Sequence, residues 1–176
     1  MSALPTGSTP WTTGSTPQIV GQDETHARIH TLLTAATAAL LEEQPDLLGF
    51  EDHRPQRDRS SGVSWRGMET FCHVSALLAS SGVPGRVDAG AARLLGAADA
   101  VATVRGLHRR SESDAHGICG ASWTDATGDL LEVIVGVRVA VRAVSAPFLP
   151  GSLRPVGSTS PPSPISPLTP PPRRLS

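Results

Sequence analysis

The alternation of apolar and polar side chains is most regular between residues 117 and 148. A period of two is typical of a half-buried strand, because successive side chains point to opposite faces of the sheet. The predicted buried face contains Leu131, Val133, Val135, Val137, Val139 and Val141. The predicted polar face contains Glu132, Arg138 and Arg142. A Val137→Asp substitution is therefore expected to bury an unpaired charge and to unfold the domain.

Turn-forming residues divide this region into a hairpin. Residues 118–123 lead into residues 124–129, where Thr, Asp and Gly residues are typical of a turn. Asp125 and Asp129 flank this turn, where turn chemistry explains an aspartate better than catalysis does. Gly136 interrupts the apolar run, and it predicts a bulge or a tight reversal that creates another strand.

An amphipathic helix is predicted over residues 23–44. Its apolar stripe recurs at steps of three and four residues and contains Ile29, Leu33, Ala36 and Leu40. Asp23 is the expected N-cap, and Pro45 ends the helix because proline cannot continue it.

A second helix is predicted after the break at residues 80–85, where Ser, Gly and Pro gather. Asp88 is its expected cap, and Gly106 lies near its end. Its apolar face contains Ala91, Leu94, Leu95, Ala98, Val101 and Ala102. The many alanines on this face would allow a close approach to a sheet.

Three segments show no clear period. Residues 46–64 are polar and carry charges of both signs, so they predict a solvated loop, with partner docking as the alternative. Residues 65–79 fit a helix or a strand, and we favour a short strand near Cys72 that lies beside the strand of Cys119. Residues 107–116 are expected to form a surface loop.

These elements predict a single α+β domain over residues 22–156, with two helices packed on one face of a small, mainly antiparallel sheet. The outward Arg138 and Arg142 would suit an anionic ligand or partner, or face solvent. Residues 1–21 are rich in Thr, Gly, Ser and Pro, and residues 157–176 are rich in Pro and Ser. Both ends are expected to be disordered, because they bury too little apolar surface to offset chain entropy.

The amino-acid composition indicates the type of genome and argues against some classes of function. Every basic residue is Arg, and Lys, Asn and Tyr are absent, which indicates a GC-rich, actinobacterial genome. The net charge of -1 argues against nucleic-acid binding. No segment has the length and apolar character of a transmembrane span, and no signal peptide precedes the domain. A chain that begins at Met1 is therefore expected in the cytosol.

Residues with reactive or metal-binding side chains are few. The strongest metal-ligand candidate is the group His108, Asp114, His116 and Cys119, although its spacing matches no standard zinc motif. Cys72 or Cys119 would act as a nucleophile only with a histidine in reach and a lowered thiol pKa. We therefore expect no cofactor and no enzymatic activity. The two cysteines are compatible with one bridge or with two free thiols.

The layout that includes Trp123, Gly128, residues 131–141 and residues 148–151 resembles that of small actinobacterial cell-envelope lipoproteins. These proteins combine a Thr, Ser, Gly and Pro tether with a helix, a cysteine-bearing middle, an Ala-rich helix and a final hairpin. The resemblance implies an envelope or extracellular location and a disulfide, for which Cys72 and Cys119 are the candidates. It implies no known activity.

Three hypotheses for the function follow. The leading one is a non-enzymatic module, envelope-associated or secreted, that is structural or binds an envelope protein or ligand. The second is a cytosolic metal-binding protein or small enzyme that uses residues 108–119. The third is a truncated or frame-changed product without selected function, which the Pro-rich tail suggests.

Overall fold

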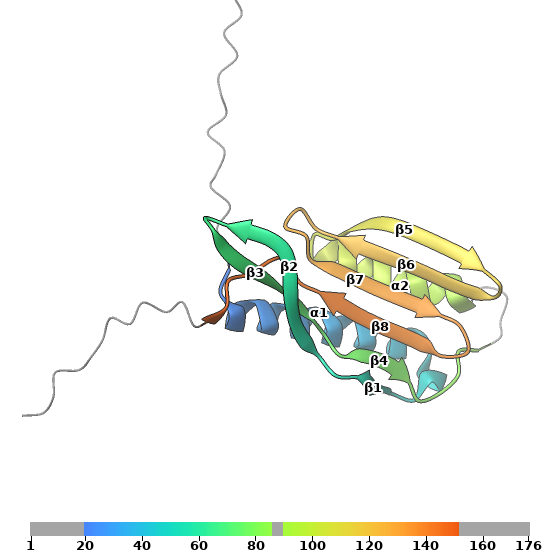
Figure 1. Ribbon diagram of the computed structural model, residues 1–176. Coiled ribbons are helices and arrows are strands. Elements are labelled where there is room, and N and C mark those ends of the chain that lie inside the picture. Colours follow the sequence, from blue (N-terminus) through green and yellow to red (C-terminus); the bar gives the residue numbers. More distant parts are fainter. Residues whose placement is uncertain (1–19, 86–89, 152–176) are drawn as a thin grey trace, which may run out of the picture.

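Two helices cover one face of an eight-stranded antiparallel sheet (Figure 1). The computed structural model describes residues 20–85 and 90–151. The helices are α1 (Gln22–Glu43), the short 3-10 helix η1 (Pro45–Leu47) and α2 (Gly90–Val104). The strands are β1 (Phe50–Arg54), β2 (Arg57–Trp65), β3 (Met68–Val74), β4 (Leu77–Ser80), β5 (His108–Ala115), β6 (Ile118–Thr124), β7 (Leu130–Val135) and β8 (Val139–Val144). The predicted α+β class is confirmed.

The sheet has two parts that meet at β8. The four strands β5 to β8 follow one another as a meander, and β8 then pairs with β4, which pairs with β1. β2 and β3 pair with each other, and β3 joins the sheet where Val74 faces Val144 at the end of β8. We call β1 to β4 the broken hairpin, because each of its two long arms is interrupted once.

The meander contains the predicted hairpin and most of the sheet's buried residues. The predicted inward residues Leu131, Val133, Val139 and Val141 have no exposed surface. Gly136 marks a tight reversal, as one of the two expected alternatives, and its N–H donates to the Arg138 carbonyl at 3.0 Å.

Because of this reversal, Val137 is not on the buried face where the alternation placed it. Val137 lies at the tip of the β7–β8 turn and is 84% exposed, so the prediction that Val137→Asp would unfold the domain is wrong. Val135 and Val139 face each other across this turn and both point inward. Because they are an even number of residues apart, the alternation reads as unbroken through the turn.

The first helix closely matches its prediction. α1 packs its apolar stripe against β8, β3 and α2, and Ile29, Ala36 and Leu40 are fully buried. Its N-cap is Gly21 and not Asp23, and Thr25 Oγ1 donates to the Gly21 carbonyl at 2.9 Å. The helix ends before Pro45, as expected.

The second helix lies over the meander. α2 contacts β5, β6 and β7, and its fully buried residues include Leu94, Ala98 and Ala102. The small side chains of Ala98 and Ala102 permit a close approach to its neighbours. The expected cap Asp88 lies in residues 86–89, outside the described part of the chain.

Two segments that we expected to be loops are strands. Residues 46–64 contain β1 and most of β2, and residues 107–116 contain β5. Every residue of β5 is exposed, and the strand is held by its pairing with β6. Edge strands of this kind carry no apolar alternation, because backbone hydrogen bonds to one neighbour position them without burial of a face.

The two cysteines are free thiols that the sheet keeps apart. The predicted strand near Cys72 is β3, but β8 and β7 separate it from β6, which carries Cys119. Cys119 lies level with one end of β8 and β3 joins the other end, so the two Cα atoms are more than about 20 Å apart. A disulfide needs Cα atoms within about 7 Å, so the candidate bridge does not fit this fold.

Among the described residues, no helix is both long enough and apolar enough to cross a membrane.

Candidate functional site

The broken hairpin and α1 enclose a cleft at the point where both arms of the hairpin are interrupted. Arg54 faces Leu77 and Arg57 faces Val74, so the gap between β1 and β2 lies directly opposite the gap between β3 and β4. The first gap contains Pro55, whose missing N–H prevents continued pairing. The ladder therefore opens on both arms at the same level.

Two serines join the inner arm of the hairpin to β8 beside this gap. Ser75 donates its N–H to the Ala143 carbonyl at 2.9 Å, and Ser75 Oγ accepts from the Ala143 N–H at 2.9 Å. In the same way, Ser145 Oγ accepts from the His73 N–H at 2.8 Å. Side-chain oxygens thus replace carbonyl acceptors at the break and keep the backbone groups paired.

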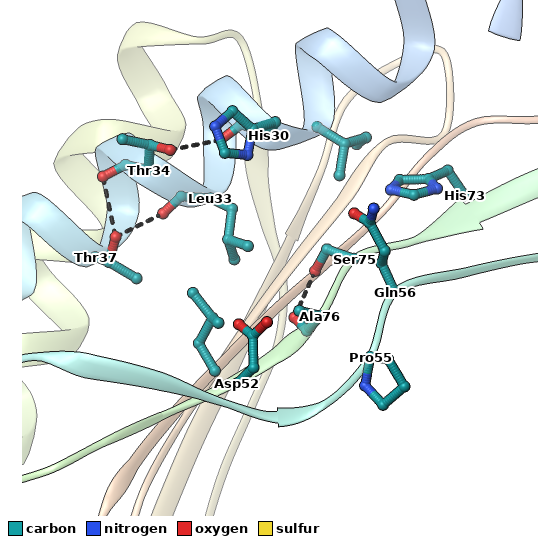
Figure 2. A pocket seen from close by; sticks show the side chains of 12 residues that line it. His30, Leu33, Thr34, Thr37, Asp52, Pro55, Gln56, His73, Ser75 and Ala76 are labelled. Carbon is teal, nitrogen blue, oxygen red and sulfur yellow. Dashed lines mark hydrogen bonds between the residues drawn. The ribbon is translucent and has the colours of Figure 1, made fainter. Parts of the chain in front are cut away.

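The resulting cavity has a volume of about 440 Å³ (Figure 2). Its apolar lining comes from Ile29, Leu33, Pro55, Ala76 and Leu78. Its polar lining comes from His30, Thr34, Thr37, Asp52, Gln56, His73 and Ser75. One carboxylate is present in the lining and no Arg, so the cavity offers hydroxyl, amide, imidazole and carboxylate groups to a ligand.

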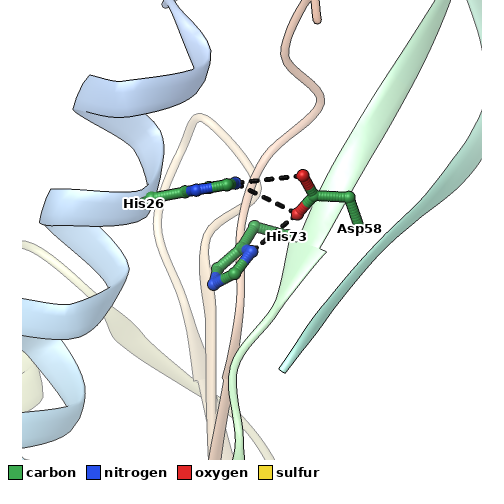
Figure 3. A group of neighbouring side chains, drawn as sticks. All are labelled: His26, Asp58 and His73. Carbon is green, nitrogen blue, oxygen red and sulfur yellow. Dashed lines mark hydrogen bonds and ion pairs between the residues drawn. The ribbon is translucent and has the colours of Figure 1, made fainter. Parts of the chain in front are cut away.

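His73 also belongs to a cluster with His26 and Asp58 (Figure 3). His26 Nε2 lies 3.0 Å from Asp58 Oδ1, and His73 Nδ1 lies 2.6 Å from the same oxygen. His26 comes from the beginning of α1, whereas Asp58 and His73 are cross-strand partners on β2 and β3. One potential ligand atom from each residue lies within 4.8 Å of the others.

Neighbouring residues orient the cluster. Gln22 Nε2 donates to Asp58 Oδ2 at 3.1 Å, while Gln22 Oε1 accepts from the Gly151 N–H at 2.8 Å. The ring centroids of His26 and His73 lie 4.0 Å apart, and those of His26 and Phe148 lie 5.7 Å apart with the two rings nearly perpendicular. The side chain of His73 is 4% exposed, so the cluster runs from the surface into the buried end of β3.

The structure does not assemble the predicted metal site. His108 and Asp114 lie near opposite ends of β5, about 20 Å apart by strand rise. Asp114 faces Cys119 across the β5–β6 pair, and His116 lies in the turn with a φ of 55°. The four residues therefore do not share one ion.

The cysteine microenvironments do not favour nucleophilic chemistry. Burial raises the pKa of the Cys72 thiol, which outweighs the opposite effect of Arg59. Desolvation, followed by the charge of Asp114, raises the pKa of the Cys119 thiol. A raised pKa lowers the thiolate fraction, and the thiolate is the reactive form.

Of the two arginines on the predicted partner face, Arg142 is already paired within the protein. Arg142 on β8 donates through Nε to Glu132 Oε2 on β7 at 2.8 Å, so a neighbouring carboxylate already neutralises it. Arg138 is exposed in the β7–β8 turn. Asp125 has the expected turn role, since its Oδ1 accepts from three backbone N–H groups.

Asp129, by contrast, does more than form a turn. Its side chain is 5% exposed and accepts from Arg28 of α1 at 2.6 and 2.9 Å and from the Ala146 N–H at 2.7 Å. The hydrogen bond to Asp129 is the main cause of a raised pKa of Arg28. This pair fastens α1 to the meander.

No protein-family model matches this chain, and no curated protein is similar to it at a significant level. A structural similarity does exist, to the crystal structure of a DUF4853 family protein from Actinomyces odontolyticus ATCC 17982. The TM-score is 0.50 at 15% identity, and the match covers 75% of this chain and 71% of the other. The similarity shows a shared fold, and the neighbour is actinobacterial.

Proposed function

We propose that this protein is a non-enzymatic binding module whose ligand lies in the cleft between α1 and the broken hairpin. The observation that supports the proposal is the cavity of about 440 Å³ at the paired strand breaks. Small-molecule sites usually measure about 300–1,000 Å³ and combine apolar walls with a few polar groups. The cavity has this size and this mixture.

The lining favours a small polar ligand that is neutral or cationic. Asp52 contributes the one carboxylate among the lining residues, and His30 and His73 contribute imidazoles. An anionic ligand would face Asp52 without an arginine to balance its charge. The apolar residues Ile29, Leu33 and Leu78 would contact a hydrocarbon part of the ligand.

We place this module in the cell envelope or outside the cell. Support comes from the resemblance to envelope lipoproteins and from the Thr, Gly, Ser and Pro composition of residues 1–21, which suits a tether. Fractionation of the native host followed by detection of the protein would test the location. Recovery in the cytosol alone would contradict it.

Two threonines on α1 provide a matched pair of variants for the cleft. Both side chains are exposed, and each hydroxyl donates to the carbonyl four residues earlier. Thr34 lines the cavity and Thr31 does not. Thr34→Phe should therefore fill the mouth of the cleft, and Thr31→Phe should leave it open. Both variants should retain the wild-type circular dichroism.

The experiment is a screen of small polar compounds by heteronuclear NMR. A ligand of the cleft should shift the backbone amide signals of Thr37, Gln56 and Ala76, and it should bind Thr31→Phe as it binds the wild type. Thr34→Phe should reduce its affinity at least about 10-fold, which corresponds to about 1.4 kcal/mol. Compounds that bind both variants equally, or that shift none of these signals, would contradict the proposal.

A further inference from the structure

We propose that His26, Asp58 and His73 bind a divalent transition-metal ion, with Zn²⁺ as the best fit. The site is separate from the one predicted at residues 108–119, and it does not depend on a ligand in the cleft. Among the residues that the structure describes, this is the one group of three His, Cys, Asp or Glu side chains with mutually close ligand atoms.

The donor set matches the ion. Two imidazole nitrogens and one carboxylate oxygen are common protein ligands of Zn²⁺, and three protein ligands leave a fourth position for water or another molecule. Ca²⁺ and Mg²⁺ prefer oxygen ligands alone, so two imidazoles favour a transition metal. The chemistry of the cluster therefore selects the class of ion.

The geometry requires only small movements. Zn²⁺ lies about 2.0–2.2 Å from nitrogen and oxygen ligands, so two ligand atoms of a tetrahedral site are about 3.4 Å apart. His26 Nε2 and His73 Nδ1 now lie 3.0 and 2.6 Å from Asp58 Oδ1, and all three ligand atoms lie within 4.8 Å. Side-chain adjustments of about an ångström would place them around one ion.

Proton balance is satisfied by a change of tautomer. His26 Nε2 and His73 Nδ1 both point at the Asp58 carboxylate, and because a carboxylate only accepts, each of these nitrogens must carry a proton to form its hydrogen bond. Each ring would bind the ion through the nitrogen that now points at Asp58 and would carry its proton on the other ring nitrogen. No proton is gained or lost when two neutral rings change tautomer in this way.

The surroundings hold the ligands and leave a path for the ion. Gln22 fixes Asp58 Oδ2, and the β2–β3 pairing places Asp58 opposite His73. Partners of this kind orient metal ligands and contribute to affinity. The side chains of His26 and Asp58 are 34% and 26% exposed, so the ion can enter from solvent although His73 is buried.

The alternative is a hydrogen-bonded fastening of α1 to the broken hairpin that binds no ion. The two arrangements differ in one measurable property, which is a specific, saturable affinity for Zn²⁺. The test uses the full chain after treatment with a chelator and its removal, with Zn²⁺ alone as the probe in calorimetry and Co²⁺ as the probe in absorption spectroscopy. Because no cleft ligand is added, failure of the cleft proposal leaves this result unaffected.

We expect one Zn²⁺ per chain, a rise in Tm with Zn²⁺, and visible Co²⁺ bands that Zn²⁺ abolishes. His26→Gln and Asp58→Asn should each weaken binding at least about 100-fold, because even partners outside the ligand set are worth about 10- to 100-fold. The partly exposed His26 makes His26→Gln the safer variant, and its fold is checked by circular dichroism.

Histidines outside the proposed zinc site provide matched control variants. His53 is exposed on β1 in the same hairpin, and His108 with His116 represents the site predicted from the sequence. His53→Gln and the double variant His108→Gln/His116→Gln should bind Zn²⁺ as the wild type does. The proposal is wrong if the wild type binds no Zn²⁺, if folded His26→Gln and Asp58→Asn bind it unchanged, or if the control variants lose it equally.

Discussion

The meander and the broken hairpin are halves of one sheet, yet they differ in nearly every property. In β6 to β8 the inward residues, such as Trp123, Val133 and Val141, are fully buried beneath the helices. In β1 and β2 most residues are exposed, and the arms are interrupted at Pro55 and Ser75. The first half contains most of the buried apolar residues of the sheet, whereas the second contains the cleft and the His26 cluster.

The buried core of the sheet and its candidate binding sites therefore lie in different halves. Each half is fastened to α1 by one aspartate: Asp129 of the meander pairs with Arg28, and Asp58 of the hairpin contacts His26. Asp129 is 5% exposed and Asp58 is 26% exposed. An interrupted, more solvated region can rearrange around a ligand at a lower cost than a close-packed core can.

A substitution in the buried core of the meander should lower the free energy of unfolding more than any other change considered. Val133→Asp should unfold the domain, because it buries a charge with no partner and costs about 5 kcal/mol or more, comparable with the whole stability of a domain. Val137→Asp, on the exposed turn of the same meander, should change the free energy of unfolding by less than about 0.5 kcal/mol. Circular dichroism during urea unfolding measures both, and a folded Val133→Asp protein would show that this half does not provide the core.

A second comparison uses the two aspartates that fasten α1. Asp129→Asn should cost about 2–3 kcal/mol, because it leaves the Arg28 guanidinium and a buried backbone N–H poorly paired. Asp58→Asn should cost about 1 kcal/mol or less, since the Asp58 side chain is 26% exposed, against 5% for Asp129. The urea midpoints of the two variants, compared with that of the wild type, measure these losses. Equal losses would mean that the hairpin contributes as much stability as the meander.

A weak pH dependence is expected where Asp99 of α2 accepts hydrogen bonds from Arg109 of β5 and Trp123 of β6. The hydrogen bond from Trp123 Nε1 is the main cause that lowers the pKa of Asp99 below its ordinary value of 3.8, and the hydrogen bond and charge of Arg109 add to it against the opposite effect of desolvation. Because the folded pKa is lowered, the ionised carboxylate stabilises the fold above pH 3.8, and this contribution is lost as the pH falls from 3.8 through the folded pKa. The side chain is 41% exposed, so the effect should be small.

Asp99→Asn provides the control for this pH effect. Its free energy of unfolding should fall less than that of the wild type when the pH is lowered from neutrality to below 3.8. The difference should be confined to that acidic range, where thermal unfolding followed by Trp fluorescence measures it. Identical pH profiles for the two proteins would rule out a stabilising role for the Asp99 carboxylate.

Local periodicity was sufficient to predict the elements that bury one continuous face. The strands of the β6–β8 region and both helices follow from apolar side chains repeated at two, three or four residues, because burial imposes that spacing on the chain. The same reasoning placed Val137 in the core, since the β7–β8 reversal preserves the alternation. It also missed β2 and β5, whose exposed residues carry no burial signal.

Patterns within short segments therefore predict the fold class, the two helices and the main hairpin. The cleft and the cluster depend on how these segments pack together. His26 and His73 lie 32 and 15 residues from Asp58 along the chain, with no motif to connect them. They meet because β2 pairs with β3 and α1 packs across the hairpin. Long-range contacts of this kind depend on which surfaces pack together, and no spacing within one segment encodes that choice.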